Sequence, residues 1–247
     1  MTVRVAALYD IHGNLPALEA VLAEVARLAP DAIVVGGDVA AGPFPCETLD
    51  RLRALSVEVR FVRGNADREL AEALPAADPW VLEQLDDADR AFLRSFEPRV
   101  VLDVDGLGAT LFCHGSPRSD EEILTRATSE ERLARVLADV PQRVVVCGHT
   151  HVQFDRLATG LRVVNAGSVG MPYESGPGAY WALLGPGLEL RRTLYDLEGA
   201  AEAIRASSWP GADAFVREHL LVIPTADEAT AYFEGLALER DQLEPPG

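Results

Sequence analysis

The sequence predicts an α/β fold, and three features of its 247 residues support this class. In the first half, short apolar runs alternate with segments that carry apolar residues every three or four positions. Strands that are apolar throughout and alternate with helices are typical of parallel βαβ units covered on both faces. From Arg99 onward, pairs of apolar runs flank glycine-containing turns, which predicts antiparallel hairpins. A hydrophobic content of 48% is ample for one sizeable core.

The first half is expected to hold three strands and three helices. The run RVAALY is apolar from its second residue, whereas LPALEAVLAEVARLA has the spacing of an amphipathic helix. The later strands and helices follow the same two patterns. The expected strands are residues 4–9, 31–38 and 57–65, and the expected helices are residues 15–29, 46–55 and 86–96.

The second half is expected to be richer in strands. It contains, in order, a hairpin at 99–115, a helix at 129–140, a strand at 143–151, and strand pairs at 152–168 and 180–196. The tail from Leu197 is expected to be helical, with breaks at Pro210 and Pro224 and a frayed end at 244–247. We therefore expect a core of residues 1–196 and a C-terminal helical appendage of residues 197–247 packed on the same domain.

Composition excludes several function classes. The formal charge of −17 argues against binding to nucleic-acid backbones, which requires basic patches. All 22 basic residues are arginine, so a P-loop lysine and a Schiff-base lysine are both excluded. No apolar run approaches the roughly 20 residues of a membrane span. The apolar stretch before Asp10 has only five residues, too few for a secretory signal.

The three cysteines indicate the cellular compartment in which the protein is expected. Cys46, Cys113 and Cys147 are odd in number and widely spaced, and two of them end apolar runs. Buried free thiols suit this pattern better than metal ligands do, and a cytoplasmic protein is expected.

Polar residues gather where the predicted strands end. All three asparagines and three of the five histidines lie within two positions of a glycine, and His151 lies three positions after Gly148. The carboxyl ends of strands in an open α/β sheet meet at one edge, so we expect these tips to converge. The converging donors are Asp10, His12, Asp38, Asn65, His114, His149 and His151.

Seven nitrogen and oxygen donors are too many for one ion and suit two. Mixed imidazole and carboxylate ligands favour Zn, Mn, Fe or Ni over Ca or Mg. Two such ions side by side generate a hydroxide at neutral pH and stabilise the oxygens of an in-line displacement at phosphorus. The period of two along a strand places His149 and His151 on one face, as two adjacent ions require. Each motif has a plainer explanation on its own, namely a helix cap, a turn or a surface histidine.

The motifs D-x-H, G-G-D, G-N-x-D, H-G and G-H-T-H occur in this order between Val3 and Val169. This set resembles the calcineurin-like metallophosphoesterase family, and in particular its small prokaryotic branch. DIHGNLPALEAVL and NAGSVGMP resemble that branch, which is associated with phosphodiesterase or phosphatase activity. The resemblance implies a four-layer αββα sandwich of two mixed β-sheets flanked by helices. It also implies binuclear-metal-dependent hydrolysis of phosphate esters by a metal-bridging hydroxide.

The resemblance also divides the ligands. It implies that Asp10, His12 and His151 hold one metal, that Asn65, His114 and His149 hold the other, and that Asp38 bridges them. It places Arg63, before the G-N pair, where related phosphatases hold a phosphate-binding arginine. A planar donor fork suits phosphate, although a surface arginine at a strand end is the alternative.

Other polar residues have weaker patterns. Asn14 and the backbone of residues 165–170 are expected either to line the substrate pocket or to serve as turn residues. We expect Arg118 to make no substrate contact, and His219 to lie on a solvated helix face.

One position departs from the family. Many members have histidine after the G-N pair, where it protonates the leaving oxygen, whereas this chain has Ala66. Such acid catalysis is typically worth about 10²–10⁴-fold. The alternative to an enzyme is therefore a catalytically silent scaffold of the same fold that binds a protein partner, although all seven ligand positions are intact. A metallo-β-lactamase-type hydrolase fits badly, because its H-x-H-x-D-H motif is missing.

Overall fold

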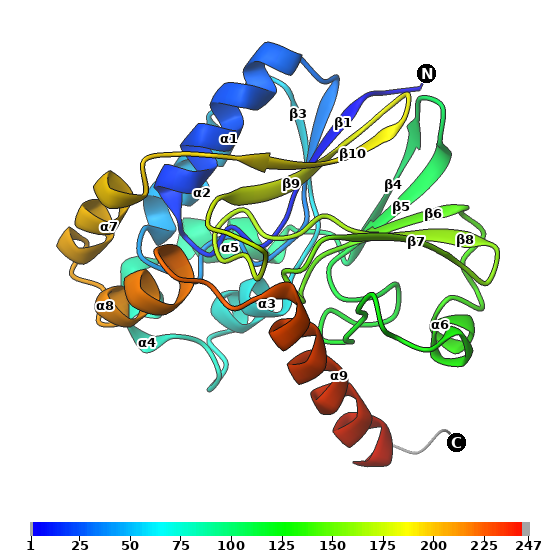
Figure 1. Cartoon of the computed structure of the whole chain (residues 1–247). Helices are drawn as coiled ribbons and strands as arrows, with labels where there is room; N and C mark the ends of the chain where they lie inside the picture. Colours follow the sequence, from blue (N-terminus) through cyan, green and yellow to red (C-terminus); the bar gives the residue numbers. More distant parts are fainter. Residues whose placement is uncertain (1, 244–247) are drawn as a thin grey trace.

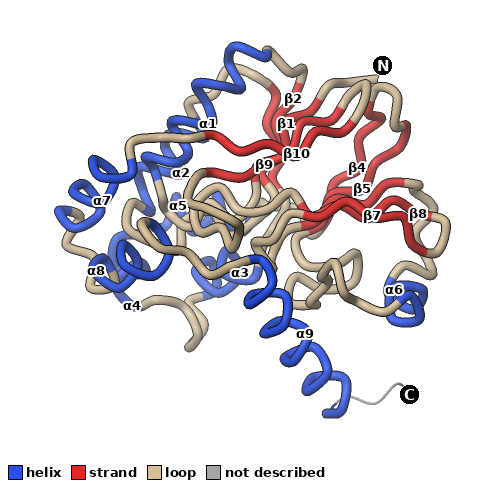
Figure 2. Tube along the Cα trace, viewed as in Figure 1, coloured by secondary structure: helices blue, strands red, loops and turns tan. Residues whose placement is uncertain are grey.

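Two five-stranded β-sheets packed face to face form the centre of the molecule, and helices cover their outer faces (Figures 1 and 2). The structure, a computed structural model, describes residues 2–243, so the frayed end predicted at 244–247 lies outside the described residues. This is the predicted four-layer αββα sandwich.

The first sheet has the order β10-β9-β1-β2-β3. Its first three strands in the chain are parallel, and β9 and β10 add antiparallel pairs at one side. The strands are β1 (Val5–Leu8), β2 (Ala32–Val35), β3 (Glu58–Phe61), β9 (Ala179–Leu184) and β10 (Leu188–Thr193).

The second sheet has the order β4-β5-β6-β8-β7. Strands β5, β6 and β8 are parallel, and an antiparallel strand closes each edge. The strands are β4 (Arg99–Val104), β5 (Gly108–Cys113), β6 (Val144–Cys147), β7 (Phe154–Ala158) and β8 (Leu161–Asn165).

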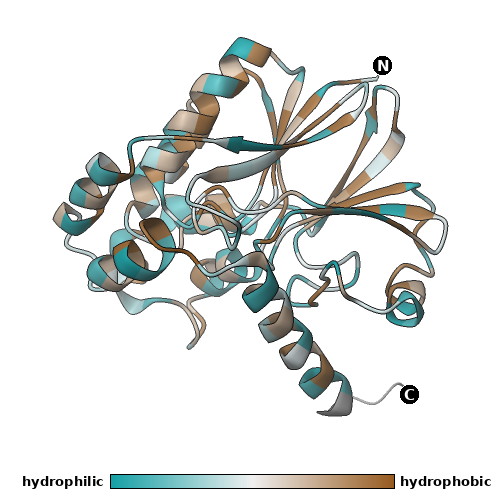
Figure 3. Cartoon of the chain, in the orientation of Figure 1, coloured by the Kyte–Doolittle hydropathy of each residue, from teal (hydrophilic) through white to brown (hydrophobic). Residues whose placement is uncertain are grey.

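Alternation along the strands explains the layers. In β1, Val5 and Ala7 face a core shared with the second sheet, whereas Ala6 and Leu8 face helices α1 to α5. The outer face of the second sheet packs on α6. Strands buried on both faces are apolar throughout, as Figure 3 shows by their brown colour. The helices are α1 (Leu15–Leu28), α2 (Pro45–Arg53), α3 (Asn65–Glu72), α4 (Pro79–Gln84), α5 (Asp87–Arg94) and α6 (Glu130–Val136).

The chain after β10 is mainly helical. Its elements are α7 (Leu197–Ala206), α8 (Ala212–Phe215), a π-helical turn (Val216–Leu220) and α9 (Ala226–Leu243). Helix α9, red in Figure 1, runs away from the two sheets. Among residues 2–243, no helix is both long and apolar enough to span a bilayer.

The structure corrects several predicted boundaries. Helices α3 and α4 were not predicted, and the strand expected at 57–65 ends at Phe61 because Asn65 begins α3. The helix expected at 129–140 ends at Val136. All three cysteines are free thiols, but only Cys113 and Cys147 are buried, while Cys46 is half-buried.

Candidate metal centre

The seven predicted donors follow strands β1, β2, β3, β5 and β6, and six of them form two compact groups. Each group has three ligand atoms within 4.8 Å of one another. The groups lie against each other, since His114 Nε2 is 3.8 Å from Asp10 Oδ1 and His12 Nε2 is 3.9 Å from Asp38 Oδ2. Both sheets thus contribute ligands to one centre. The groups are Asp10, His12 and His151, and Asp38, His114 and His149.

Asn65 lies beside the second group. The next backbone amide, that of Ala66, donates a hydrogen bond to Asp38 Oδ1 at 2.8 Å. The backbone at Gly64 approaches Asp38 so closely that a side-chain carbon added at Gly64 would lie 2.2 Å from that same oxygen. Glycine is therefore required before Asn65.

Five of the seven donors have a left-handed backbone, which non-glycine residues rarely adopt. Such conformations cost about 1–3 kcal/mol each and cluster at functional sites. These positions lie just beyond strands, and the ligand atoms of their side chains converge in the two groups. The five are Asp10 (φ 52°), His12 (49°), Asp38 (52°), His149 (66°) and His151 (57°).

Backbone carbonyls hold two of the imidazoles in one orientation. His114 Nδ1 lies 2.8 Å from Gly36 O, and His151 Nδ1 lies 2.7 Å from Met171 O. A ring nitrogen next to a carbonyl oxygen must donate its proton, so in the neutral ring the lone pair is on Nε2. This arrangement is typical of metal-binding histidines.

Three buried atoms at the centre have no hydrogen-bond partner: Asp10 Oδ1, Asn65 Oδ1 and His114 Nε2. Unpaired buried acceptors are rare in folded proteins, and each requires an explanation. One divalent cation at each ligand group would satisfy these atoms, Asp10 in one group and Asn65 and His114 in the other. The donor set therefore fits two transition-metal ions.

Burial sets the protonation of two ligands. Burial, with His151 nearby, lowers the pKa of His12 to about 4. Burial, with His114 nearby, lowers the pKa of His149 to about 4. Both rings are neutral at pH 7, which is the form that binds metal.

The carboxylates create a site for positive charge. Burial would raise the pKa of Asp38, but His114 outweighs this effect and lowers it. Against the effect of burial, Asp38 and Asp10 raise the pKa of His114 to about 10. The field of these carboxylates therefore favours a cation at His114 Nε2.

Asp67, the last residue of the G-N-x-D motif, is a buried carboxylate beside the centre. It is fully buried, and burial and Asp38 raise its pKa to about 7. Its oxygens accept backbone N–H bonds from Asp38, Val39 and Gly64, each at 2.9 Å. Asp67 thus ties the Asp38 loop to the start of α3.

Two of the asparagines stabilise loops. Asn14 is fully buried, caps α1 through Ala17 N–H at 3.2 Å and donates to Gly170 O at 2.9 Å. These contacts support the turn role, and a contact between Asn14 and the substrate stays a prediction. Asn165 is also buried, and its amide donates to Gly148 O at 2.6 Å and Thr150 Oγ1 at 3.0 Å, which holds the G-H-T-H loop.

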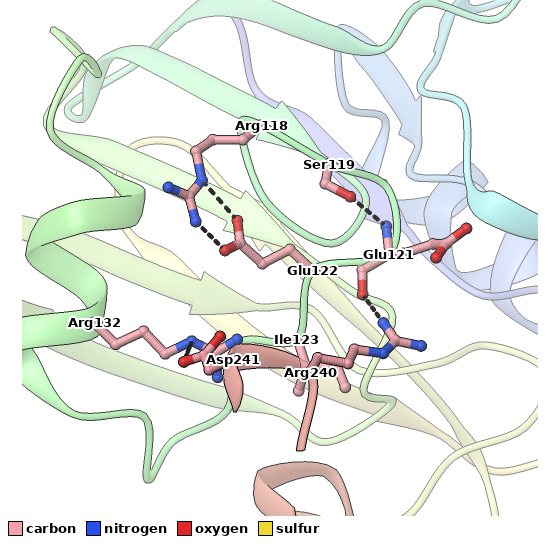
Figure 4. A pocket seen from close by; sticks show the side chains of 8 residues that line it. All are labelled: Arg118, Ser119, Glu121, Glu122, Ile123, Arg132, Arg240 and Asp241. Carbon is pink, nitrogen blue, oxygen red and sulfur yellow. Dashed lines mark hydrogen bonds and ion pairs between the residues drawn. The ribbon is translucent and has the colours of Figure 1, made fainter. Parts of the chain in front are cut away.

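The arginines differ in how far they are engaged. Arg63 is half-buried, and its Nε is buried without a hydrogen-bond partner. Arg118 pairs with Glu122 on the wall of a separate cavity of about 520 Å³ (Figure 4). None of the seven donors lines this cavity, and its other arginines are paired as well, Arg132 with Asp241 and Arg240 with the Glu121 carbonyl.

Sequence reasoning missed the aromatic residues beside the centre and misplaced His219. The Tyr173 ring stacks on His151 with centroids 5.0 Å apart, and Phe233 of α9 lies 6.5 Å from His149. His219 lies 6.0 Å from Tyr173 and is half-buried, so it does not occupy a solvated face. The Tyr173 segment directly follows the NAGSVGMP motif, but nothing local in the sequence marks Phe233.

Comparisons with known proteins agree with this geometry. The profile of the calcineurin-like phosphoesterase superfamily domain matches residues 3–184. Phosphodiesterase YfcE of Escherichia coli K12 is 27% identical over 186 residues, covering 70% of this chain and 83% of its own.

Two solved structures share the fold. A metallophosphoesterase from Sphaerobacter thermophilus superposes with a TM-score of 0.70 and 26% identity, covering 86% of this chain and 97% of its own. The hypothetical protein PH1004 from Pyrococcus horikoshii OT3 has a TM-score of 0.76 and 21% identity, covering 89% and 98%. The chain therefore belongs to the calcineurin-like phosphoesterase superfamily and is a hydrolase that acts on phosphoric ester bonds.

Proposed function

We propose that the protein is a phosphodiesterase or phosphatase that uses two divalent transition-metal ions, with Mn, Fe, Zn and Ni as candidates. The observation that carries the proposal is the pair of adjoining ligand groups. When bound, such ions activate water and neutralise negative charge on the phosphate. The name of the YfcE relative favours phosphodiesters. A cytoplasmic location stays a prediction.

The chain's own residues would have distinct roles. Asp38 would touch both ions, because its Oδ2 is 3.4 Å from His114 Nε2 in one group and 3.9 Å from His12 Nε2 in the other. Asn65 and His114 would direct their unpaired acceptors at the second ion. Arg63 would donate to a phosphate oxygen through its guanidinium.

The test is a metal analysis followed by a panel of phosphate esters with Mn, Ni, Zn or Mg added. We expect two transition-metal ions per chain, hydrolysis of activated aryl esters, and a reversible loss of activity with a chelator. Full activity with one ion would contradict the binuclear mechanism. If the metal-loaded protein hydrolyses no ester above background, it is instead a silent scaffold of this fold.

A further inference from the structure

Aromatic rings flank both imidazoles of the G-H-T-H loop. Tyr173 stacks on His151 with a 22° angle between the rings, and Phe233 lies beside His149. Tyr173 and Phe233 are themselves 6.3 Å apart between centroids. Both rings are half-buried, so each keeps part of its surface exposed.

His219 is the third ring of this cluster. It contacts Tyr173 on one side and lies 5.9 Å from Phe215 on the other. Its Nδ1 is buried and has no hydrogen-bond partner. Burial lowers the pKa of His219, so the ring is neutral at pH 7. It therefore adds a third neutral ring, packed against Tyr173, to the cluster.

Two of these three residues come from outside the matched family domain. The family match ends at residue 184, whereas His219 lies in the π-helical turn and Phe233 in α9. The residue after Phe233 is fixed, because Glu234 Oε1 accepts hydrogen bonds from Thr125 at 2.5 Å and Thr128 at 2.8 Å. The segment after β10 is thus anchored with its rings beside the site.

We propose that Tyr173, His219 and Phe233 form a subsite for the organic group of the substrate. The subsite selects phosphate esters that carry a planar unsaturated ring, such as nucleoside esters. The ring faces of Tyr173 and Phe233 stack on planar groups, and His219 packs against the Tyr173 ring. None of the three side chains is charged at pH 7, so the phosphate itself is left to the metal centre. The inference rests on the proposed function, because it takes the metal centre as the site that binds the phosphate.

The experiment compares two diesters with the same leaving group, thymidine 5′-(4-nitrophenyl phosphate) and methyl 4-nitrophenyl phosphate. Because both release 4-nitrophenolate, a difference in kcat/KM reports binding of the other group. We expect the wild type to prefer the thymidine ester by at least about 10-fold, as one stacked base provides. Phe233→Ala and His219→Ala should each remove most of this preference through KM. Phe233→Leu should keep the fold and lose the preference, and Leu238→Ala, an exposed change on the same helix, should leave it intact.

Calorimetry supplies a readout independent of turnover. The metal-loaded wild type should bind thymidine 5′-monophosphate about 10-fold more tightly than methyl phosphate, and Phe233→Ala should abolish the difference. Equal handling of the ring-bearing and methyl compounds by the wild type overturns the subsite. The subsite is also overturned if the variants lose kcat/KM equally for the thymidine and methyl diesters while their metal content is unchanged. If the wild type hydrolyses neither ester, the proposed function fails, and the calorimetry alone then decides on the subsite.

Discussion

Asp38 is the residue whose replacement discriminates best between one ion and two. Asp38→Asn keeps an oxygen ligand but removes the charge, so activity should fall by at least about 100-fold, because even outer-shell partners of metal ligands are worth about 10–100-fold. The fold should stay largely intact by circular dichroism. Asp213→Asn, an exposed carboxylate on α8, is the control and should change nothing. If Asp38→Asn binds two ions and keeps full activity, the proposal that Asp38 bridges the ions is contradicted.

A second prediction about a single residue concerns Ala66, which stands where many family members have a histidine. Without a histidine here, rates should fall steeply as the pKa of the leaving group rises, because little besides the metals and Arg63 stabilises the departing charge. Asp67 cannot substitute, since its oxygens are occupied by backbone amides. Ala66 is half-buried, and Ala66→His should help alkyl esters more than aryl esters.

The measurement is kcat/KM for a series of esters with the wild type and Ala66→His. A shallow dependence in the wild type would mean that another group already supplies the proton. Equal gains for alkyl and aryl esters would also contradict this account of Ala66.

Helix α9 depends more on polar contacts than on apolar packing. Ala229 and Ala237 are its only buried apolar residues among those described, while Tyr232 and Leu238 are largely exposed. Glu234→Ala removes both threonine hydrogen bonds to a charged acceptor, and we expect local destabilisation of about 1–2 kcal/mol after allowance for partial exposure. Hydrogen exchange of α9 amides should accelerate accordingly. Glu239→Ala, exposed on the same helix, is the control, and unchanged protection in Glu234→Ala would refute the anchoring role.

The elements show where sequence reasoning succeeds. Apolar runs such as residues 32–35 are buried on both faces, so their composition alone predicts a strand. The start of α3 was missed because Asn65 follows the strand after only three residues, and its N-cap is glycine without a capping side chain. Six of the seven proposed ligands form the two groups in the structure, and their convergence could be predicted because they follow strand ends. Asp67, Tyr173 and Phe233 were not, because their roles depend on contacts between distant parts of the chain.

At the scale of the whole molecule, metal binding should couple to stability. The centre holds two buried carboxylates, Asp10 and Asp38, inside a chain of net charge −17. A ligand at 1,000 times its Kd stabilises the folded state by about 4 kcal/mol. For a protein of this size, 1 kcal/mol shifts Tm by about 2–4 °C, so Zn or Mn should raise Tm by roughly 8–16 °C.

Calorimetric scans with and without a chelator test this coupling. Ca²⁺ should shift Tm less, because it prefers oxygen ligands over imidazole. Asp38→Asn should show a reduced shift with Zn or Mn. An identical Tm in all these conditions would show that the two ligand groups do not bind these ions.

The left-handed backbone at five of the ligands has a consequence for protein design. Copying the seven side chains onto the strand ends of another α/β protein would not reproduce this centre. Ordinary loops would keep those residues at negative φ and aim their ring nitrogens and oxygens elsewhere. A successful transplant would have to carry the turns, with Gly64, Asp67 and Asn165 that hold them, as one unit. The unit that would have to be transferred is therefore the set of loops together with the ligands that they carry.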